Sequence, residues 1–100
     1  IDPGYLALAA GARADNLDTW LTGEETMKKI FVSASRGADL SVIEGVMGLY
    51  DGGRGGVSST AQIAKALRAP VLLVIDVRSM GESAAAIAKG FRDYDPEVNL

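Results

Sequence analysis

The chain has 100 residues, of which 48% are hydrophobic and 23% charged, a balance typical of a soluble globular domain. Its net charge of −3 and its lack of a Lys/Arg cluster argue against binding to nucleic acid or to anionic membrane surfaces, because phosphates must be neutralised by several basic side chains on one face. No apolar run reaches the roughly 20 residues that span a bilayer, and the first residues lack the basic start of a signal peptide, so we expect a cytoplasmic protein. Cysteine and histidine are absent, which removes disulfides, thiolate nucleophiles and the usual zinc ligands.

The first third of the sequence predicts two helices. Residues 5–10 are expected to form a short helix, and residues 16–18 resemble the end of a strand. A longer helix is predicted over residues 23–36, because the acids Glu24 and Glu25 favour a helix start and apolar residues then recur at helical spacing.

Two apolar runs further along predict buried strands. Residues 70–76 form a continuous apolar run entered by a proline and closed by an acid, and residues 40–45 form a shorter run rich in β-branched residues. A helix that begins near Thr60 and ends before Ala69 lies between them, and residues 83–91 predict a further crossover helix. The last residues, Val98-Asn99-Leu100, resemble the start of another strand.

Strands that alternate with helices indicate an α/β fold with a mostly parallel sheet and right-handed crossover helices. We expect residues 1–100 to form a single partial domain, because the final strand is cut short. The open sheet edge would expose unpaired backbone groups, so association into homo-oligomers is expected when the chain is isolated. Ligands bind such sheets beyond the carboxyl ends of the strands. The segments predicted at that edge are residues 16–18, 44–56 and 76–81.

The most informative segment is residues 44–53, in which an acid at a predicted strand end leads into a loop with repeated glycines. Such a loop can bring backbone amides close to an anion. The carboxylate of Glu44 is well placed to hold Mg²⁺ through oxygen ligands, and Asp51 offers a second contact. The alternative is that the glycines only form turns and that both acids are solvated.

The string Glu-Gly-Val-Met-Gly-Leu-Tyr-Asp-Gly at residues 44–52 resembles, nearly letter for letter, the signature of the cobyrinate a,c-diamide synthase family. Three other stretches agree with that family: Ile-Asp-Pro-Gly-Tyr at 1–5, Asn-Leu-Asp at 16–18 and Ser-Thr-Ala at 59–61. The matches occur in the same order and extend up to about Phe91, which makes the resemblance specific.

The resemblance implies a glutamine-dependent and ATP-dependent amidotransferase of cobalamin biosynthesis. Such an enzyme uses ATP and Mg²⁺ to activate the a and c carboxylates of the corrin precursor cobyrinate as acyl phosphates, which ammonia from glutamine converts to carboxamides. It also implies a P-loop NTPase fold similar to dethiobiotin synthetase, with a glutaminase domain further along the parent chain. The family's phosphate-binding loop and its cysteine nucleophile are missing from these 100 residues, so the segment alone is expected to be inactive.

The resemblance also implies roles for three acids. Asp2 matches an acid near the reacting carboxylate and Mg²⁺, Glu44 matches the acid most similar to the magnesium ligand, and Asp51 matches the loop acid of the signature. Phosphoryl transfer needs charge neutralisation and alignment more than covalent help, so two or three carboxylates around Mg²⁺ are the expected equipment.

Other residues are candidates for binding, and each has a structural alternative. Hydroxyls at the predicted helix start could contact a carboxylate or phosphate of the substrate, or only cap the helix. Aromatic rings near the loop could line the corrin pocket or only pack. Groups after the strand at residues 70–76 could contact nucleotide or only cap a turn. The candidates are Ser58, Ser59 and Thr60 for the first role, Tyr5 and Tyr50 for the second, and Asp76 and Ser79 for the third. Asp18 has the same alternatives as Asp76, and Arg54 could attract a substrate carboxylate or only be solvated.

Two other functions remain open. A sister amidotransferase that acts on hydrogenobyrinate or on a nickel-sirohydrochlorin would share the motifs. A non-catalytic nucleotide-binding or ligand-binding α/β module is the second alternative; a nucleotide switch of this kind would have a basic face and a strand-end aspartate in place of Glu44-Gly45, and the sequence has neither.

Overall fold

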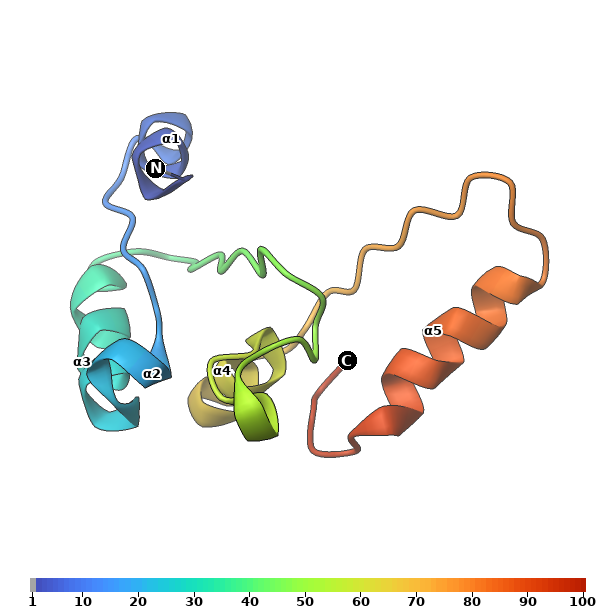
Figure 1. The fold of residues 1–100 in the computed structure, drawn as a ribbon. Coiled ribbons are helices and arrows are strands. Elements are labelled where there is room, and N and C mark those ends of the chain that lie inside the picture. Colours follow the sequence, from blue (N-terminus) through green and yellow to red (C-terminus); the bar gives the residue numbers. More distant parts are fainter. Residues whose placement is uncertain (1) are drawn as a thin grey trace. The chain divides into compact units, whose positions relative to one another are not determined.

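The computed structural model describes residues 2–100, and the regular structure in them is helical (Figure 1). The chain divides into two compact units, Ile1–Ile63 and Ala64–Leu100, and the boundary falls within a helix. The elements are α1 (Asp2–Ala10), α2 (Thr19–Thr22), α3 (Glu24–Ala34), the short 3₁₀ turn η1 (Arg54–Gly56), α4 (Thr60–Leu67) and α5 (Ser83–Tyr94).

The predicted helices are confirmed in position. The expected helix over residues 23–36 is α3, the expected helix near Thr60 is α4, and the expected helix over residues 83–91 is α5, which continues to Tyr94. The short helix expected over residues 5–10 is α1, which already begins at Asp2.

The predicted α/β fold with a mostly parallel sheet is wrong, because residues 2–100 contain no strand. The P-loop fold that the resemblance implied depends on that sheet and is not seen either. Residues 40–45, 70–76 and 98–100 have irregular structure instead. A strand exists only when a neighbouring strand accepts and donates its backbone hydrogen bonds, and an apolar pattern cannot supply that neighbour.

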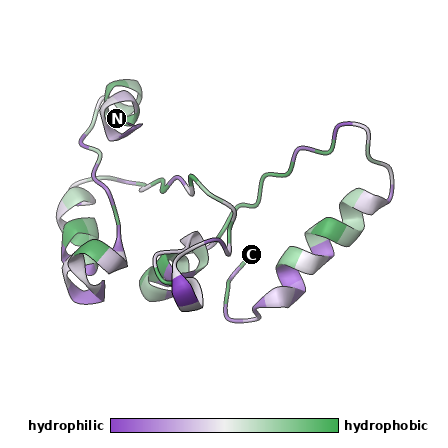
Figure 2. Cartoon of the chain, in the orientation of Figure 1, coloured by the Kyte–Doolittle hydropathy of each residue, from purple (hydrophilic) through white to green (hydrophobic). Residues whose placement is uncertain are grey.

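The two apolar runs therefore remain uncovered. The side chains of Val42 and Leu72 are 87% and 91% exposed. Figure 2 shows the apolar colour along the coil that leads toward α4 and along the coil that follows it. One backbone hydrogen bond, from Val71 N to the carbonyl oxygen of Asn99 (2.8 Å), joins the second run to the end of the chain.

Within the first unit, α2 and α3 pack together around Met27, whose side chain is fully buried. Asp18 caps α2, and Gly23 links the two helices with a φ of 77°, a left-handed conformation that glycine adopts without a Cβ penalty. The amino group of Lys28 lies 2.6 Å from the carboxylate of Glu24 one turn earlier. Local interactions begin and end both helices. The sequence pattern predicted α3, whereas α2 was not predicted, since residues 16–18 resembled the end of a strand.

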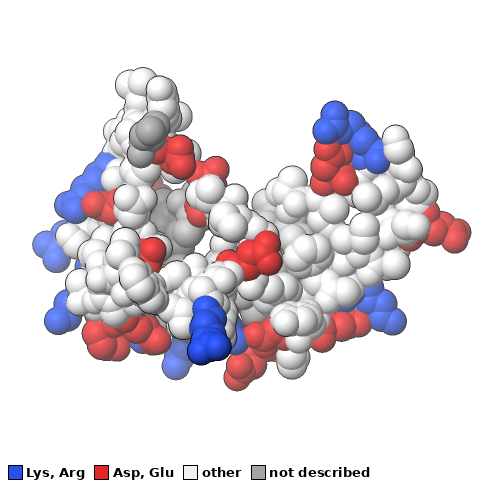
Figure 3. All heavy atoms as spheres, in the orientation of Figure 1, with Lys and Arg blue, Asp and Glu red and all other residues white. Residues whose placement is uncertain are grey.

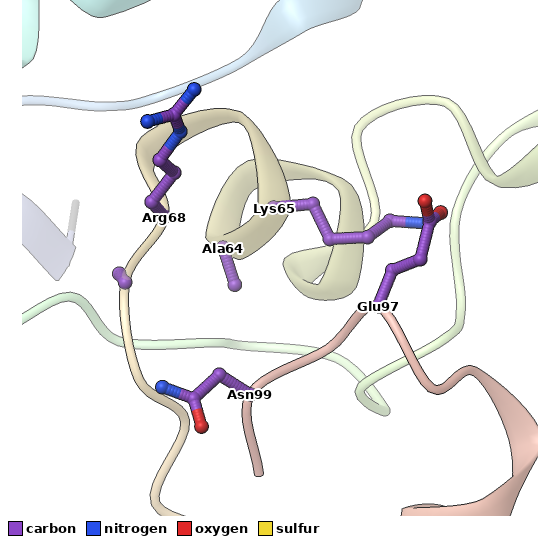
Figure 4. A pocket seen from close by; sticks show the side chains of 6 residues that line it. Ala64, Lys65, Arg68, Glu97 and Asn99 are labelled. Atoms are coloured by element: carbon purple, nitrogen blue, oxygen red, sulfur yellow. The ribbon is translucent and has the colours of Figure 1, made fainter.

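Within the second unit, the last turn of α4 contacts the segment after α5. Lys65 Nζ donates to Asp95 Oδ2 at 2.6 Å, which raises the pKa of Lys65 and lowers the pKa of Asp95. Val98, which follows Asp95 by three residues, is also buried. A hollow of about 450 Å³ lies here, and Figure 4 shows Lys65 reaching toward Glu97 while Arg68 leaves α4 in another direction. The hollow is lined by Ala64, Lys65, Arg68, Ala69, Glu97 and Asn99.

Two properties of residues 2–100 bear on what they could bind: the distribution of charged side chains, and the length and apolar character of the helices. On the face of residues 2–100 drawn in Figure 3, basic and acidic side chains are interspersed rather than gathered by sign. Within the same residues, no helix has both the length and the apolar character needed to cross a membrane.

Replacing the buried side chain of Met27 is expected to destabilise the first unit. Met27→Ala should lower the free energy of unfolding by about 2–5 kcal/mol, because a fully buried side chain is lost and a cavity remains. Val32→Ala, on the same helix but 62% exposed, is the matched control and should change it by less than about 0.5 kcal/mol. Urea unfolding measures both, and equal effects would contradict the placement of the core.

Candidate functional site

Residues 44–59, which we call the signature loop, fold back onto the start of α4. Within the loop, Asp51 N donates to Gly48 O (2.9 Å) and Gly53 N donates to Val57 O (2.8 Å). The loop is joined to the helix by a bond from Ala61 N to the carbonyl oxygen of Leu49 (2.9 Å), and both of these residues are buried. The loop is therefore an ordered structure built against α4.

Three glycines of the loop lie where a side chain would collide. A Cβ on Gly45 would lie 2.7 Å from both Cγ2 and Oγ1 of Thr60. A Cβ on Gly52 would lie 2.7 Å from the carbonyl oxygen of Val57 and 2.9 Å from the amide of Ser59, and one on Gly48 would overlap the carboxylate of Asp51. Gly45 and Gly52 therefore serve close approach, which goes beyond the simple turns that the sequence left as the alternative. At Gly48 the Cβ would meet only the end of the Asp51 side chain, which can rotate away.

A polar network at the start of α4 joins the loop to the start of α2. Ser58 Oγ donates to Asp18 Oδ1 (2.8 Å) and accepts from Trp20 N (2.8 Å). Gln62 Oε1 accepts from Ser58 N (2.6 Å) and from Thr19 Oγ1 (2.7 Å). Thr19 Oγ1 also lies 3.1 Å from Ser58 Oγ. Residues 38 to 43 positions apart are thus held by side-chain hydrogen bonds.

Asp18 is an N-cap that also binds this network. Its Oδ1 accepts from the amides of Trp20 (2.8 Å) and Leu21 (3.0 Å) in the first turn of α2. These bonds favour the charged carboxylate, and the pKa of Asp18 is lowered, first by the Leu21 amide and then by the Ser58 hydroxyl. The carboxylate therefore stays ionised at neutral pH and orients the hydroxyl of Ser58.

The structure brings several predicted site residues together in the signature loop. Glu44 is exposed and directly precedes Gly45, which lies against Thr60, the first residue of α4. Asp51 is exposed, with its carboxylate beside Gly48. Ser59 is buried, and its Oγ accepts from Gln62 N (3.1 Å), so this hydroxyl caps α4 as the structural alternative predicted.

Other predicted residues lie elsewhere. Asp2 and Tyr5 are exposed on α1, and no described hydrogen bond joins them to the signature loop. Tyr50 is half-buried within the loop. Across residues 2–100, no three acidic side chains gather closely enough to hold a metal ion. The pairing of Asp2 with Glu44 around Mg²⁺ therefore stays a prediction.

Asp76 and Ser79 lie in the second unit, after the apolar run that was predicted as a strand. The carboxylate of Asp76 accepts from Arg78 N (3.0 Å) and from Arg78 Nε (2.9 Å), which lowers the pKa of Asp76. Ser79 has a φ of 61° in the turn that follows. Asp76 thus caps its own turn, which was the alternative to a nucleotide contact. Arg54 is exposed in η1.

Sequence reasoning missed two members of the polar network. Thr19 and Gln62 were not singled out, although Gln62 stands three residues after Ser59 at the helix start, a spacing typical of a capping box. The cap formed by Asp18 could have been read from an acid placed directly before Thr19 and Trp20. Nothing local in the sequence pairs Asp18 with Ser58.

Comparison with known proteins shows which proteins the chain is similar to. No family model and no solved structure matches the chain. Over its whole length it is 54% identical to the hydrogenobyrinate a,c-diamide synthase of Streptomyces coelicolor, 47% identical to the cobyrinate a,c-diamide synthase of Picrophilus torridus and 46% identical to that of Dehalococcoides mccartyi. The chain spans only 21–23% of the length of these relatives.

The chain is therefore homologous to one segment of the a,c-diamide synthases. The predicted resemblance to the cobyrinate a,c-diamide synthase family is confirmed, and the chain corresponds to about a fifth of such a protein.

Adding a methyl group at Gly52 should disturb the signature loop. Gly52→Ala is expected to lower the free energy of unfolding by about 1–3 kcal/mol, because its Cβ would meet backbone atoms of Val57 and Ser59 that cannot rotate away. Gly53→Ala is the matched control: its Cβ would meet Val57 at an ordinary 3.5 Å, so stability should stay equal or rise by up to about 1 kcal/mol. Urea unfolding that ranks the two variants in the opposite order would contradict this loop structure.

The cap formed by Asp18 should make stability depend on pH. The folded pKa lies below the unfolded value of about 3.9, so its contribution is present above that value and is lost as pH falls through the folded pKa. Asp18→Asn can still cap the helix but cannot ionise. The difference in unfolding free energy between the two proteins should be constant at pH 5–7 and shrink below about pH 4. A difference that does not change with pH would contradict the assignment.

Proposed function

We propose that the protein containing this segment is an amidotransferase that converts the a and c carboxylates of cobyrinate to carboxamides in cobalamin biosynthesis. The similarity over the whole chain to proteins named cobyrinate and hydrogenobyrinate a,c-diamide synthase supports this function. The ordered signature loop supports it further, because the residues that carry the resemblance at 44–52 and 59–61 contact one another across Gly45 and Thr60.

The proposed reaction uses ATP, Mg²⁺ and glutamine. ATP would activate each carboxylate as an acyl phosphate, and ammonia released from glutamine in another part of the parent protein would displace the phosphate. These substrates are those of a cytoplasmic enzyme. The exposed apolar side chains of Leu40, Val42, Ile43, Leu72 and Val74 would favour association of the isolated chain into homo-oligomers.

The carboxylates of Glu44 and Asp51 are chemically suited to bind Mg²⁺. Glu44 and Asp51 lie on one loop, and no ion pair among residues 2–100 occupies either carboxylate. Oxygen ligands of this kind are those that Mg²⁺ prefers. Glu44 and Asp2 would hold the ion, which would neutralise charge on the phosphates. Asp51 would orient the reacting groups from the loop.

Substrate contacts would come from the start of α4 and from the tyrosines. The side chain of Thr60, with its hydroxyl, lies close to Gly45 of the loop. Ser59 would contribute by fixing the start of α4, because its hydroxyl caps the helix and its amide donates to the carbonyl oxygen of Gly56. Tyr5 and Tyr50 would line the macrocycle pocket. Asp76 and Ser79 would contact the nucleotide, which requires Arg78 to release the carboxylate of Asp76.

A second candidate substrate is hydrogenobyrinate. One relative, 54% identical over the whole chain, is named for that macrocycle. The two substrates differ in the metal of the ring and present the same carboxylates, so the residues above would act on either one in the same way.

Mass spectrometry of the reaction products tests the proposed function. The full-length protein is incubated with ATP, Mg²⁺, glutamine and, in parallel, cobyrinate, hydrogenobyrinate or nickel-sirohydrochlorin. Two successive carboxylate-to-amide conversions of cobyrinate are expected. Conversion of another macrocycle alone would move the substrate to that one, and ATP hydrolysis without any amide would overturn the function.

Glu44→Gln should lower turnover while leaving the fold intact. The substitution removes a charge at constant shape from an exposed residue, so we expect kcat to fall by about 100-fold or more and the thermal midpoint to stay within about 2 °C. Glu25→Gln makes the same change on exposed α3 and should leave kcat unchanged. Unchanged turnover in Glu44→Gln would remove Glu44 from the magnesium site.

A further inference from the structure

Ser58 has a backbone conformation that its own residue type disfavours. Its φ is 60°, in the left-handed region where a Cβ is crowded and glycine is the usual residue. A non-glycine residue is kept there only when its surroundings hold it. In this structure, Ser58 is held by the hydrogen bonds of its hydroxyl and its amide.

Four side chains form what we call the polar clasp: Asp18, Thr19, Ser58 and Gln62. The hydroxyl of Ser58 donates to Asp18 Oδ1 at 2.8 Å, and its amide donates to Gln62 Oε1 at 2.6 Å. Thr19 donates to the same oxygen of Gln62 at 2.7 Å and is buried. The clasp therefore holds Ser58 from α2 on one side and from α4 on the other.

The residues on either side of Ser58 support the turn next to Asp51. Val57 O accepts from Gly53 N (2.8 Å), and Val57 O and Ser59 N are the backbone atoms against which Gly52 lies. If Ser58 shifted, its neighbours Val57 and Ser59, which contact Gly52, would shift with it. Asp51 directly precedes Gly52, so its position follows from theirs.

We propose that Ser58, held by Asp18, is a positioning residue that fixes residues 51–57 and thereby aims the carboxylate of Asp51 at the reacting groups. This inference rests on the proposed function for the identity of the reaction. The fold does not depend on the clasp alone, because the bond between Ala61 N and Leu49 O joins loop and helix independently. Loss of the hydroxyl of Ser58 loosens the loop and leaves α4 in place.

Ser58→Gly separates positioning from folding. Glycine accepts a φ of 60° without strain and lacks only the hydroxymethyl group, so the variant folds. The matched control is Ser35→Ala, which removes a serine hydroxyl that bonds to Ser41 Oγ at 2.9 Å on the exposed surface. Asp18→Ala removes the other half of the clasp, and Asp18→Asn keeps an oxygen that can accept from Ser58.

Trypsin cleavage after Arg54 reports the loop without any substrate. Arg54 is exposed in η1, inside the segment that the clasp fixes. In the full-length protein, Ser58→Gly and Asp18→Ala should speed this cleavage by about 10-fold, because local opening becomes more frequent. Cleavage after Lys28 on α3 should keep its rate, and Ser35→Ala should match the original protein. Asp18→Asn, which keeps an acceptor oxygen but loses the charge, should be cleaved more slowly than Asp18→Ala.

Steady-state kinetics test the positioning itself. Ser58→Gly and Asp18→Ala should each lower kcat by about 10-fold to 100-fold with an unchanged KM for ATP, and the double variant should be no worse than either one. An unchanged cleavage rate after Arg54 would overturn the clasp. Faster cleavage with unchanged kcat, or additive losses in the double variant, would overturn positioning. If the original protein amidates no corrin, the proposed function fails while the cleavage rates still decide whether the clasp holds the loop.

Discussion

The hydrogen bond from Ala61 N to the carbonyl oxygen of Leu49 is the contact on which the candidate site depends. The first amides of a helix have no partner within the helix, and here the signature loop supplies one. The bond fixes the middle of the loop on α4, buries Leu49 and Ala61, and brings Gly45 against Thr60. A loop rich in glycine would otherwise have many conformations. One short helix thus orders the segment that carries two of the predicted acids.

The helices could be predicted from the sequence because their causes are local. Acids at the start of α3, apolar residues at helical spacing in α4 and an alanine-rich amphipathic stretch in α5 each act within one turn or two of the chain. The predicted strands were wrong, because a sheet needs a second chain segment at hydrogen-bonding distance, which an apolar pattern does not supply. The runs at 40–45 and 70–76 have the composition of buried strands but no ladder in residues 2–100, so the prediction from composition was wrong.

The candidate site was predicted in part. The signature loop, Glu44 and Asp51 could be identified from a glycine-rich string and its resemblance to a family, and the start of α4 was expected at the right place. The contact of Gly45 with Thr60 and the bond between Asp18 and Ser58 join residues 15 and 40 positions apart. Such contacts form only in the folded chain and cannot be predicted from the spacing of residues in the sequence. The hydroxyl of Ser59 and the carboxylate of Asp76 each cap a local element, and their predicted binding roles stay predictions.

Hydrogen exchange at the amide of Ala61 in the full-length protein tests the central claim most directly. If the signature loop is held on α4 through Leu49, this amide should exchange at least about 100-fold more slowly than an unprotected one. The lysine variant Leu49→Lys, which cannot stay buried in this place, should remove most of that protection. Exchange of Ala61 at the unprotected rate in the original protein would contradict the account, because the loop would then have no fixed place on the helix.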